Sequence, residues 1–166
     1  MTDITSLIMD DHEWFRRQFA RLDDATDDAD LEAIWSPLAT ALDTHAEAEE
    51  TIFYPVLLRR GQQDPEEETE DAVKDHNKIR DAITESRKHA AGSPEWFEAV
   101  GQARTENSEH LAEEEDEGLP DFRKHSTLEQ RDELGRRWLR FHAEHPNGRG
   151  ISGRDVDPQA YLEQNS

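Results

Sequence analysis

Two segments of the chain, HAEAEETIFYP at residues 45–55 and HLAEEEDEGLP at residues 110–120, share one pattern. In each segment a histidine precedes a glutamate by four positions and a proline by ten, as His45 precedes Glu49 and Pro55. Residues four apart on a helix lie on the same face, about one turn apart. The histidine and the glutamate of each segment can therefore point together into a helical core.

Each segment is preceded by an aspartate–histidine pair at nearly the same distance. The pair occurs at residues 11–12 and again at residues 75–76, and the segment histidines follow the paired histidines by 33 and 34 positions. Two helical hairpins of similar length would then present the same residues at the same heights. Packed around a pseudo-twofold axis, they would gather six side chains: His12, His45, Glu49, His76, His110 and Glu114.

These six side chains are suited to a metal site. Imidazole and carboxylate together are ligands of iron, manganese and zinc. Two glutamates can bridge a pair of ions, with two histidines on each ion and room for water, hydroxide or a small diatomic ligand. Two carboxylates buried together without a cation would be costly. A single histidine–glutamate pair at this spacing also occurs on solvated helix faces, so the metal interpretation depends on the duplication.

Two arginines accompany the paired histidines. Arg16 and Arg80 each follow such a histidine by four positions and so lie on the same helix face. We expect them to form ion pairs with nearby carboxylates rather than to take part in catalysis.

Helical periodicity covers most of the chain, and no strand pattern is found. Long helices joined by short connections predict an all-α fold, an up-down-up-down four-helix bundle with an additional C-terminal helix. The helices are expected over about 3–24, 31–60, 64–91, 93–124 and 126–142.

The chain divides into three parts on this interpretation. The metal-binding bundle is expected within residues 1–125 and the additional helix within residues 126–145. Residues 146–166 are rich in glycine, proline and polar side chains, which predicts a flexible or loosely docked tail.

The composition excludes several classes of function. Among 166 residues are 40 acidic and 19 basic ones, for a formal net charge of −21, and there is no cysteine. A strongly negative surface repels phosphate backbones, so no nucleic-acid partner is expected. No stretch approaches the roughly 18 apolar residues of a membrane span, and the N-terminus does not resemble a secretory signal. We therefore expect a cytoplasmic protein with no membrane partner, whose metal ligands are nitrogen and oxygen.

The acidic excess also suggests a habitat. Only four of the basic residues are lysines, and many acids with few lysines are typical of proteins from salt-adapted, halophilic microbes. Concentrated salt screens the repulsion within such a carboxylate-rich surface.

The histidine and glutamate motifs resemble those of the hemerythrin family, also described as the HHE cation-binding domain. Its pattern is a histidine on the first helix, H-x-x-x-E on the second, a histidine on the third, and H-x-x-x-E or H-x-x-x-x-D on the fourth. The resemblance covers about residues 5–125. It implies two non-haem iron ions, with manganese or zinc as alternatives, bridged by Glu49 and Glu114. It assigns one histidine pair to each ion: His12 with His45, and His76 with His110.

The third helix departs from the pattern of the oxygen-carrying members, which have two histidines four apart there. The neighbours of His76 at that spacing are Ala72 and Arg80. A site with two histidines per ion has more open coordination, which argues against reversible oxygen carriage. It favours the binding or sensing of oxygen, nitric oxide or peroxide, or the handling of iron. Water, Glu50 or Glu113 would fill the vacant position.

Two other functions are alternatives to this one. The histidines and glutamates could form a polar core network in a metal-free helical interaction or structural module. The protein could also be an enzyme, a di-iron oxidase that consumes peroxide. Because no acid–base or nucleophile set is found beyond the expected metal ligands, we expect a metal- and small-ligand-binding protein rather than an enzyme.

Overall fold

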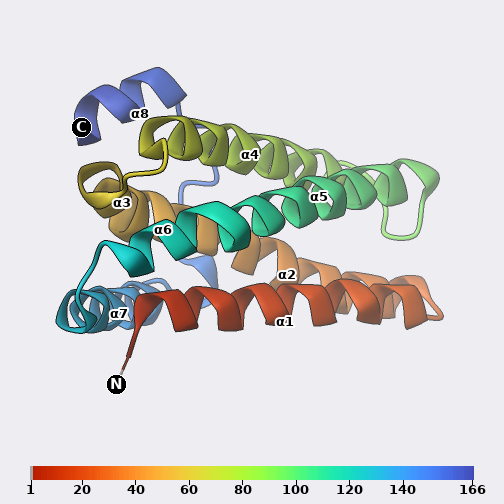
Figure 1. Ribbon diagram of the computed structural model, residues 1–166. Helices are drawn as coiled ribbons and strands as arrows, with labels where there is room; N and C mark the ends of the chain where they lie inside the picture. Colours follow the sequence, from red (N-terminus) through yellow and green to blue (C-terminus); the bar gives the residue numbers. More distant parts are fainter. Residues whose placement is uncertain (1) are drawn as a thin grey trace.

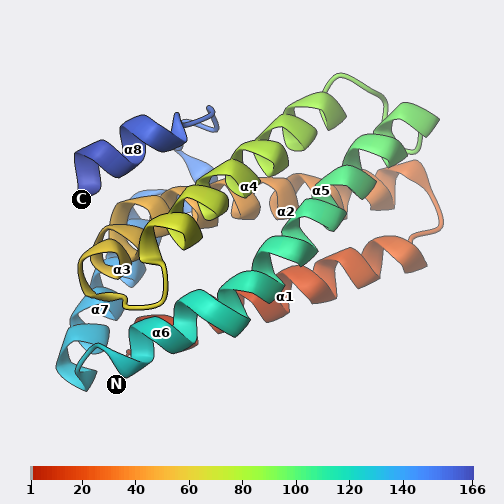
Figure 2. The same ribbon diagram turned by 45° about the horizontal axis from the view of Figure 1, so that its top comes forward.

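The computed structural model describes residues 2–166, and its body is made of four long helices (Figure 1). They are α1 (Ile4–Asp24), α2 (Asp28–Ala48), α4 (Pro65–Ser86) and α5 (Pro94–Glu113). Helices α1 and α2 form one hairpin and α4 and α5 the other, and the two hairpins pack side by side (Figure 2). No strand forms within residues 2–166. The all-α, up-down-up-down four-helix bundle predicted from the sequence is confirmed.

The remaining helices lie around one end of this body (Figure 1). Helices α3 (Tyr54–Arg60) and α6 (Leu119–Lys124) continue the directions of α2 and α5. Helix α7 (Leu128–Glu144) packs along α1 and is the additional C-terminal helix expected from the sequence. Among the described residues, no helix has both the length and the apolar character needed to cross a membrane.

Side-chain caps explain where several helices begin. Asp3, Asp27 and Ser93 each accept a hydrogen bond from a backbone N–H in the first turn of the following helix. Thr127 and Gln130 form a reciprocal capping box at the start of α7. Caps of this kind contribute about 1 kcal/mol each to helix stability.

Two π-helical turns interrupt the second and fourth helices, which the sequence predicts to be unbroken. They are η1 (Glu49–Phe53), between α2 and α3, and η2 (Glu114–Gly118), between α5 and α6. After each turn a backbone N–H bonds to the carbonyl five positions back, as that of Tyr54 does to Glu49. A proline follows one position later in both, Pro55 in the first. Because proline lacks an N–H and crowds the carbonyl four positions back, a wider turn accommodates it.

The segment after α7 differs from the flexible or loosely docked tail that the sequence predicts. It contains a short 3₁₀ turn, η3 (Pro146–Gly148), and helix α8 (Pro158–Asn165), which packs on α4. Tyr161 of α8 is buried and belongs to the apolar core. The buried side chain of α8 is this single tyrosine. The mainly polar composition of the segment therefore did not indicate that the helix is docked.

The apolar core is divided into two clusters along the bundle. One cluster gathers the start of α1 with α3, α6, α7 and α8, and the other joins the far halves of the four long helices. On α1, His12 falls between Ile8 of the first cluster and Phe15 of the second. His45 and His76 lie between the two clusters in the same way. The bundle therefore encloses a polar layer between two apolar ones.

Candidate metal centre

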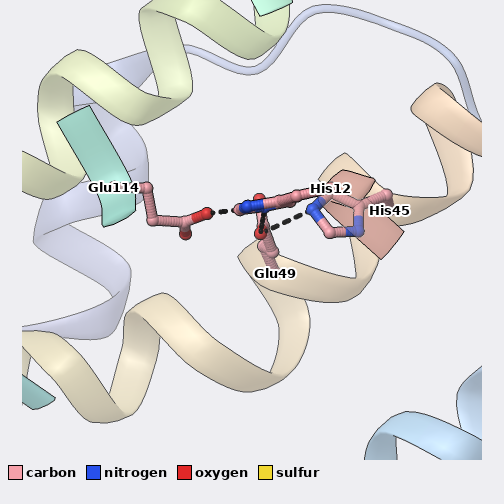
Figure 3. A group of neighbouring side chains, drawn as sticks. All are labelled: His12, His45, Glu49 and Glu114. Carbon is pink, nitrogen blue, oxygen red and sulfur yellow. Dashed lines mark ion pairs between the residues drawn. The ribbon is translucent and has the colours of Figure 1, made fainter. Parts of the chain in front are cut away.

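All six residues singled out from the sequence lie in this polar layer. Each is buried, with at most 4% of its surface exposed. They form two groups whose candidate ligand atoms lie within 4.8 Å of one another. The first group, drawn in Figure 3, contains His12, His45, Glu49 and Glu114, and the second contains Glu49, His76 and His110. The predicted duplication thus brings the six side chains together, while their role as ligands stays a prediction.

Glu49 belongs to both groups. Its Oε1 lies 2.7 Å from His45 Nε2 and 4.0 Å from His12 Nε2 (Figure 3). Its Oε2 lies 3.0 Å from His76 Nε2 and 3.6 Å from His110 Nε2. One carboxylate therefore spans both histidine pairs, as a bridging ligand must.

Glu114 reaches only one side of the layer. Its Oε2 lies 3.1 Å from His12 Nε2, and its Oε1 accepts a hydrogen bond of 2.7 Å from the Tyr54 hydroxyl. Burial and the Glu114 and Glu49 carboxylates raise the pKa of Tyr54 well above its usual range, so the hydroxyl keeps its proton and donates. The sequence predicts neither this contact nor the different positions of Glu49 and Glu114 relative to the histidines.

Further carboxylates hold the outer ring nitrogens of two histidines in equivalent arrangements. His12 Nδ1 lies 2.8 Å from Glu115 Oε1, which also accepts a hydrogen bond from Arg16. A carboxylate on one ring nitrogen fixes the ring and directs the other nitrogen inward. The predicted ion pairs of the two arginines are confirmed. The second half repeats the arrangement, with His76 Nδ1 2.9 Å from Glu50 Oε1 and Arg80 bonded to both oxygens of Glu50.

The two aspartates of the Asp-His pairs behave differently. Asp11 Oδ2 lies 3.0 Å from His45 Nδ1 and holds that ring. Among the described residues, its counterpart Asp75 pairs with Lys78 at 2.9 Å and makes no such bond to His110. The signal for these outer carboxylates was present in the sequence, because both repeats contain Asp-His and Glu-Glu.

Neither of the carboxylates considered for the vacant position beside His76 occupies it. Glu50 is held on the outer side by His76 Nδ1 and Arg80, and Glu113 is exposed. Ala72, one turn before His76, is buried and contributes only a methyl group.

Glu68, which the sequence interpretation passed over, lies against the second π turn. A Cβ built on Gly118 would lie 2.8 Å from its Oε1. Burial, together with the Glu114 and Glu117 carboxylates, raises the pKa of Glu68 to about 8. Its position two turns before His76 on one helix face was the available signal.

Carboxylates of the layer raise the pKa of two of its histidines, His45 and His76. Burial lowers the pKa of His45, but Glu49 and Asp11 outweigh this effect and raise it to about 10. For His76, the hydrogen bonds to Glu49 and Glu50 likewise outweigh burial and raise the pKa to about 9. The charge of His45 and hydrogen bonds with His110, His45 and His76 hold the pKa of Glu49 well below its usual range in spite of burial. Because a histidine must be neutral to bind a metal ion, binding a cation here would release protons.

The donor atoms of the first group fit a cation. Within residues 2–166, four buried atoms of this group make no hydrogen bond of good geometry, although they face one another in two pairs, His45 Nε2 with Glu49 Oε1 at 2.7 Å and His12 Nε2 with Glu114 Oε2 at 3.1 Å. Buried polar atoms without a well-directed hydrogen bond are costly, and a cation between the two pairs would satisfy all four atoms. Imidazole nitrogens and carboxylate oxygens together are ligands for iron, manganese or zinc.

A cavity of about 690 Å³ opens between α1, α2 and the residues around η3. Asp11 and Phe15 are among its lining residues, and both contact His45, Phe15 with its ring centroid 5.1 Å from that of the imidazole. A small molecule in this cavity would meet the residues that support the His45 side of the layer.

Comparison with known proteins agrees with this geometry. The family model of the hemerythrin HHE cation binding domain matches residues 3–122. This range contains the four long helices and the six histidines and glutamates of the polar layer. No curated protein and no solved structure matches the chain significantly. Family membership and the buried histidine–glutamate cluster together indicate a metal-binding domain. The chain therefore belongs to the hemerythrin family, with its HHE cation-binding domain in the first four long helices.

Proposed function

We propose that the polar layer holds two non-haem iron ions. The four histidines would bind them in two pairs, with Glu49 between the ions and Glu114 on the His12 side. The observation that carries the proposal is the Glu49 carboxylate, which lies within 4.0 Å of all four Nε2 atoms. Iron suits mixed imidazole and carboxylate ligands, and manganese or zinc are the alternatives.

When bound, two iron ions would supply the capacity to bind and exchange electrons with oxygen, nitric oxide or peroxide. The chain's own residues prepare the site for them. Glu115, Glu50 and Asp11 orient three imidazole rings, and the Tyr54 hydroxyl donates a hydrogen bond to Glu114. The two apolar clusters enclose the layer from both ends of the bundle.

The partner that we propose is a small oxidant, which the protein binds or senses. The methyl group of Ala72 cannot coordinate a metal, so the His76 side has an open position for water or a small molecule. The cavity beside Asp11 and Phe15 offers an approach on the other side. Open coordination favours sensing or iron handling over reversible oxygen carriage.

Metal content and the visible spectrum, in air and under reductant, test the proposal directly. We expect about two irons per chain, because six ligands are enough for two ions. His45→Ala should lose most of the iron, since it removes a buried ligand, whereas the control His89→Ala should retain it, since His89 pairs with Glu85 outside the centre. A protein that stays metal-free when reconstituted with iron would refute the proposal.

A metal-free helical module is the alternative, and one observation favours it. With His45 and His76 protonated and Glu49 ionised, opposite charges lie side by side in the layer. Such a module would keep the same melting temperature when a chelator is added. A metal centre would lose stability under chelation, because a ligand that binds only the folded state stabilises it. Turnover of peroxide, measured on the same samples, would identify an enzyme.

A further inference from the structure

One backbone carbonyl beside the centre lacks a donor within its own helix. In the turn η1, the Tyr54 N–H donates to the carbonyl of Glu49. In the same register the Glu50 carbonyl would receive the N–H of residue 55, which is a proline and has none. Backbone carbonyls in buried segments are nearly always paired, so Glu50 requires a donor from elsewhere.

Tyr161 of α8 supplies this donor. Its hydroxyl donates to the Glu50 carbonyl, and the residue is 8% exposed and belongs to the first apolar cluster. Burial and the Glu50 and Glu49 carboxylates raise the pKa of Tyr161, which keeps the hydroxyl protonated. In Figure 1, α8 lies beside α3 and α4, at the end of the bundle where η1 occurs.

The chain that leads to α8 is attached next to a second proposed ligand. Asn77, which follows His76, donates to the Val156 carbonyl at 2.7 Å and accepts from its N–H at 2.9 Å. Further back, the Ser152 N–H donates to Glu47 at 3.0 Å. Residues 152–161 therefore connect α2, which leads into the shared glutamate, with α4, which carries His76.

We propose that Tyr161 is a positioning residue for the metal centre, because its hydroxyl completes the π register of η1 and so fixes the directions of Glu49 and Glu50. The proposal rests on the metal-binding function proposed above. Glu49 is the carboxylate shared by both histidine pairs, and Glu50 holds the outer nitrogen of His76. Tyr161 lies outside the segment that matches the family model, residues 3–122, so family membership does not account for this contact.

The full-length variant Tyr161→Phe tests the contact, because it keeps the ring and removes the donor. Gln164→Ala, an exposed change on the same helix, is the control. Both proteins and the parent are loaded with ferrous iron, and the rate of iron loss to a chelator is followed by absorbance. We expect Tyr161→Phe to lose iron about tenfold faster, as is usual when an outer contact of a ligand is removed. Equal rates in Tyr161→Phe and the parent would overturn the proposal.

Amide hydrogen exchange in the iron-free protein distinguishes this proposal from the metal-binding function. Tyr161→Phe should speed the exchange of Phe53 and Tyr54 about tenfold by loosening η1 locally. Leu119, at the second π turn, should exchange as in the parent. A parent protein that binds no iron would refute the metal function, whereas unchanged exchange at Phe53 and Tyr54 would refute the role of Tyr161.

Discussion

Asp11 and Asp75 occupy equivalent positions in the two repeats, but their surroundings differ. Asp11 pairs with His45 Nδ1, whereas Asp75 forms an ion pair with Lys78 on its own helix. A neutral amide at residue 11 would orient the imidazole less strongly and lower its basicity. Asp11→Asn should therefore weaken iron retention by about 10–100-fold, and Asp75→Asn, its matched control, by much less. The rate of iron loss to a chelator measures both, and equal effects would show that the repeats are functionally symmetric.

Glu68 should make the stability of the iron-free protein depend on pH. Its pKa is raised from 4.5 to about 8, so the folded chain holds this proton more tightly than the unfolded chain does. The stability that it contributes is complete below pH 4.5 and is lost as the pH rises through 8. Glu68→Gln stays neutral and should melt at a higher temperature than the parent at pH 8.

The same comparison at pH 5 provides the check on Glu68. There the parent carboxyl is protonated in the folded chain, so the advantage of Glu68→Gln should shrink. Glu66→Gln, an exposed neighbour in the first turn of α4, should change the melting temperature little at either pH. A constant difference between Glu68→Gln and the parent at both pH values would contradict the proposed burial effect.

The six central residues could be predicted from the sequence, while their supporting residues could be predicted only in part. A spacing of four within one helix places His45 and Glu49 on one face, and the repeat supplies the rest. The contact between Tyr54 and Glu114 joins two helices whose separation no spacing within a single helix reveals. Glu50 was considered only as a ligand, because its orientation towards Arg80 depends on how α2 and α4 pack.

The sequence predicts the long helices correctly but does not predict the π turns that interrupt two of them. The helical spacing of apolar residues continues across the π turns, so periodicity alone predicts α2 and α3 to be one helix. Pro55 and Pro120 were the available evidence of a break. Their matched positions mark the repeat, and their physical effect is to widen the turn that starts at each glutamate.

Two helical glycines test how closely the elements pack. Gly135 of α7 faces the start of the chain, where an added Cβ would lie 1.5 Å from the Thr2 carbonyl oxygen. Gly135→Ala should force α7 away from α1 and reduce the free energy of unfolding by about 1–3 kcal/mol. Gly101 of α5 has nothing within 4 Å of such a Cβ. Gly101→Ala, the control, should stabilise the protein by about 0.5–1 kcal/mol, and urea unfolding of both variants measures the contrast.

The acidic residues of the protein fall into two sets with different roles. A small inner set, including Glu49, Glu50 and Glu114, is buried among histidines and an arginine. Most of the others lie on the surface with too few basic residues to balance them, which leaves the net charge of −21. Some surface acids form ion pairs, as Asp23 does with Arg104, but the acids outnumber the basic residues, so the outer set repels itself in dilute salt.

This repulsion predicts that salt stabilises the protein. The screening length falls from about 10 Å at 0.1 M salt to about 3 Å at 1 M, so the melting temperature of the iron-free protein should rise over that range. Glu66→Lys/Glu67→Lys changes two exposed acids of α4 and brings the net charge from −21 to −17. Because less repulsion is left to screen, the double variant should melt higher than the parent at 0.1 M and gain less from added salt. Parallel salt curves for the two proteins would mean that salt acts through apolar burial rather than through the acidic surface.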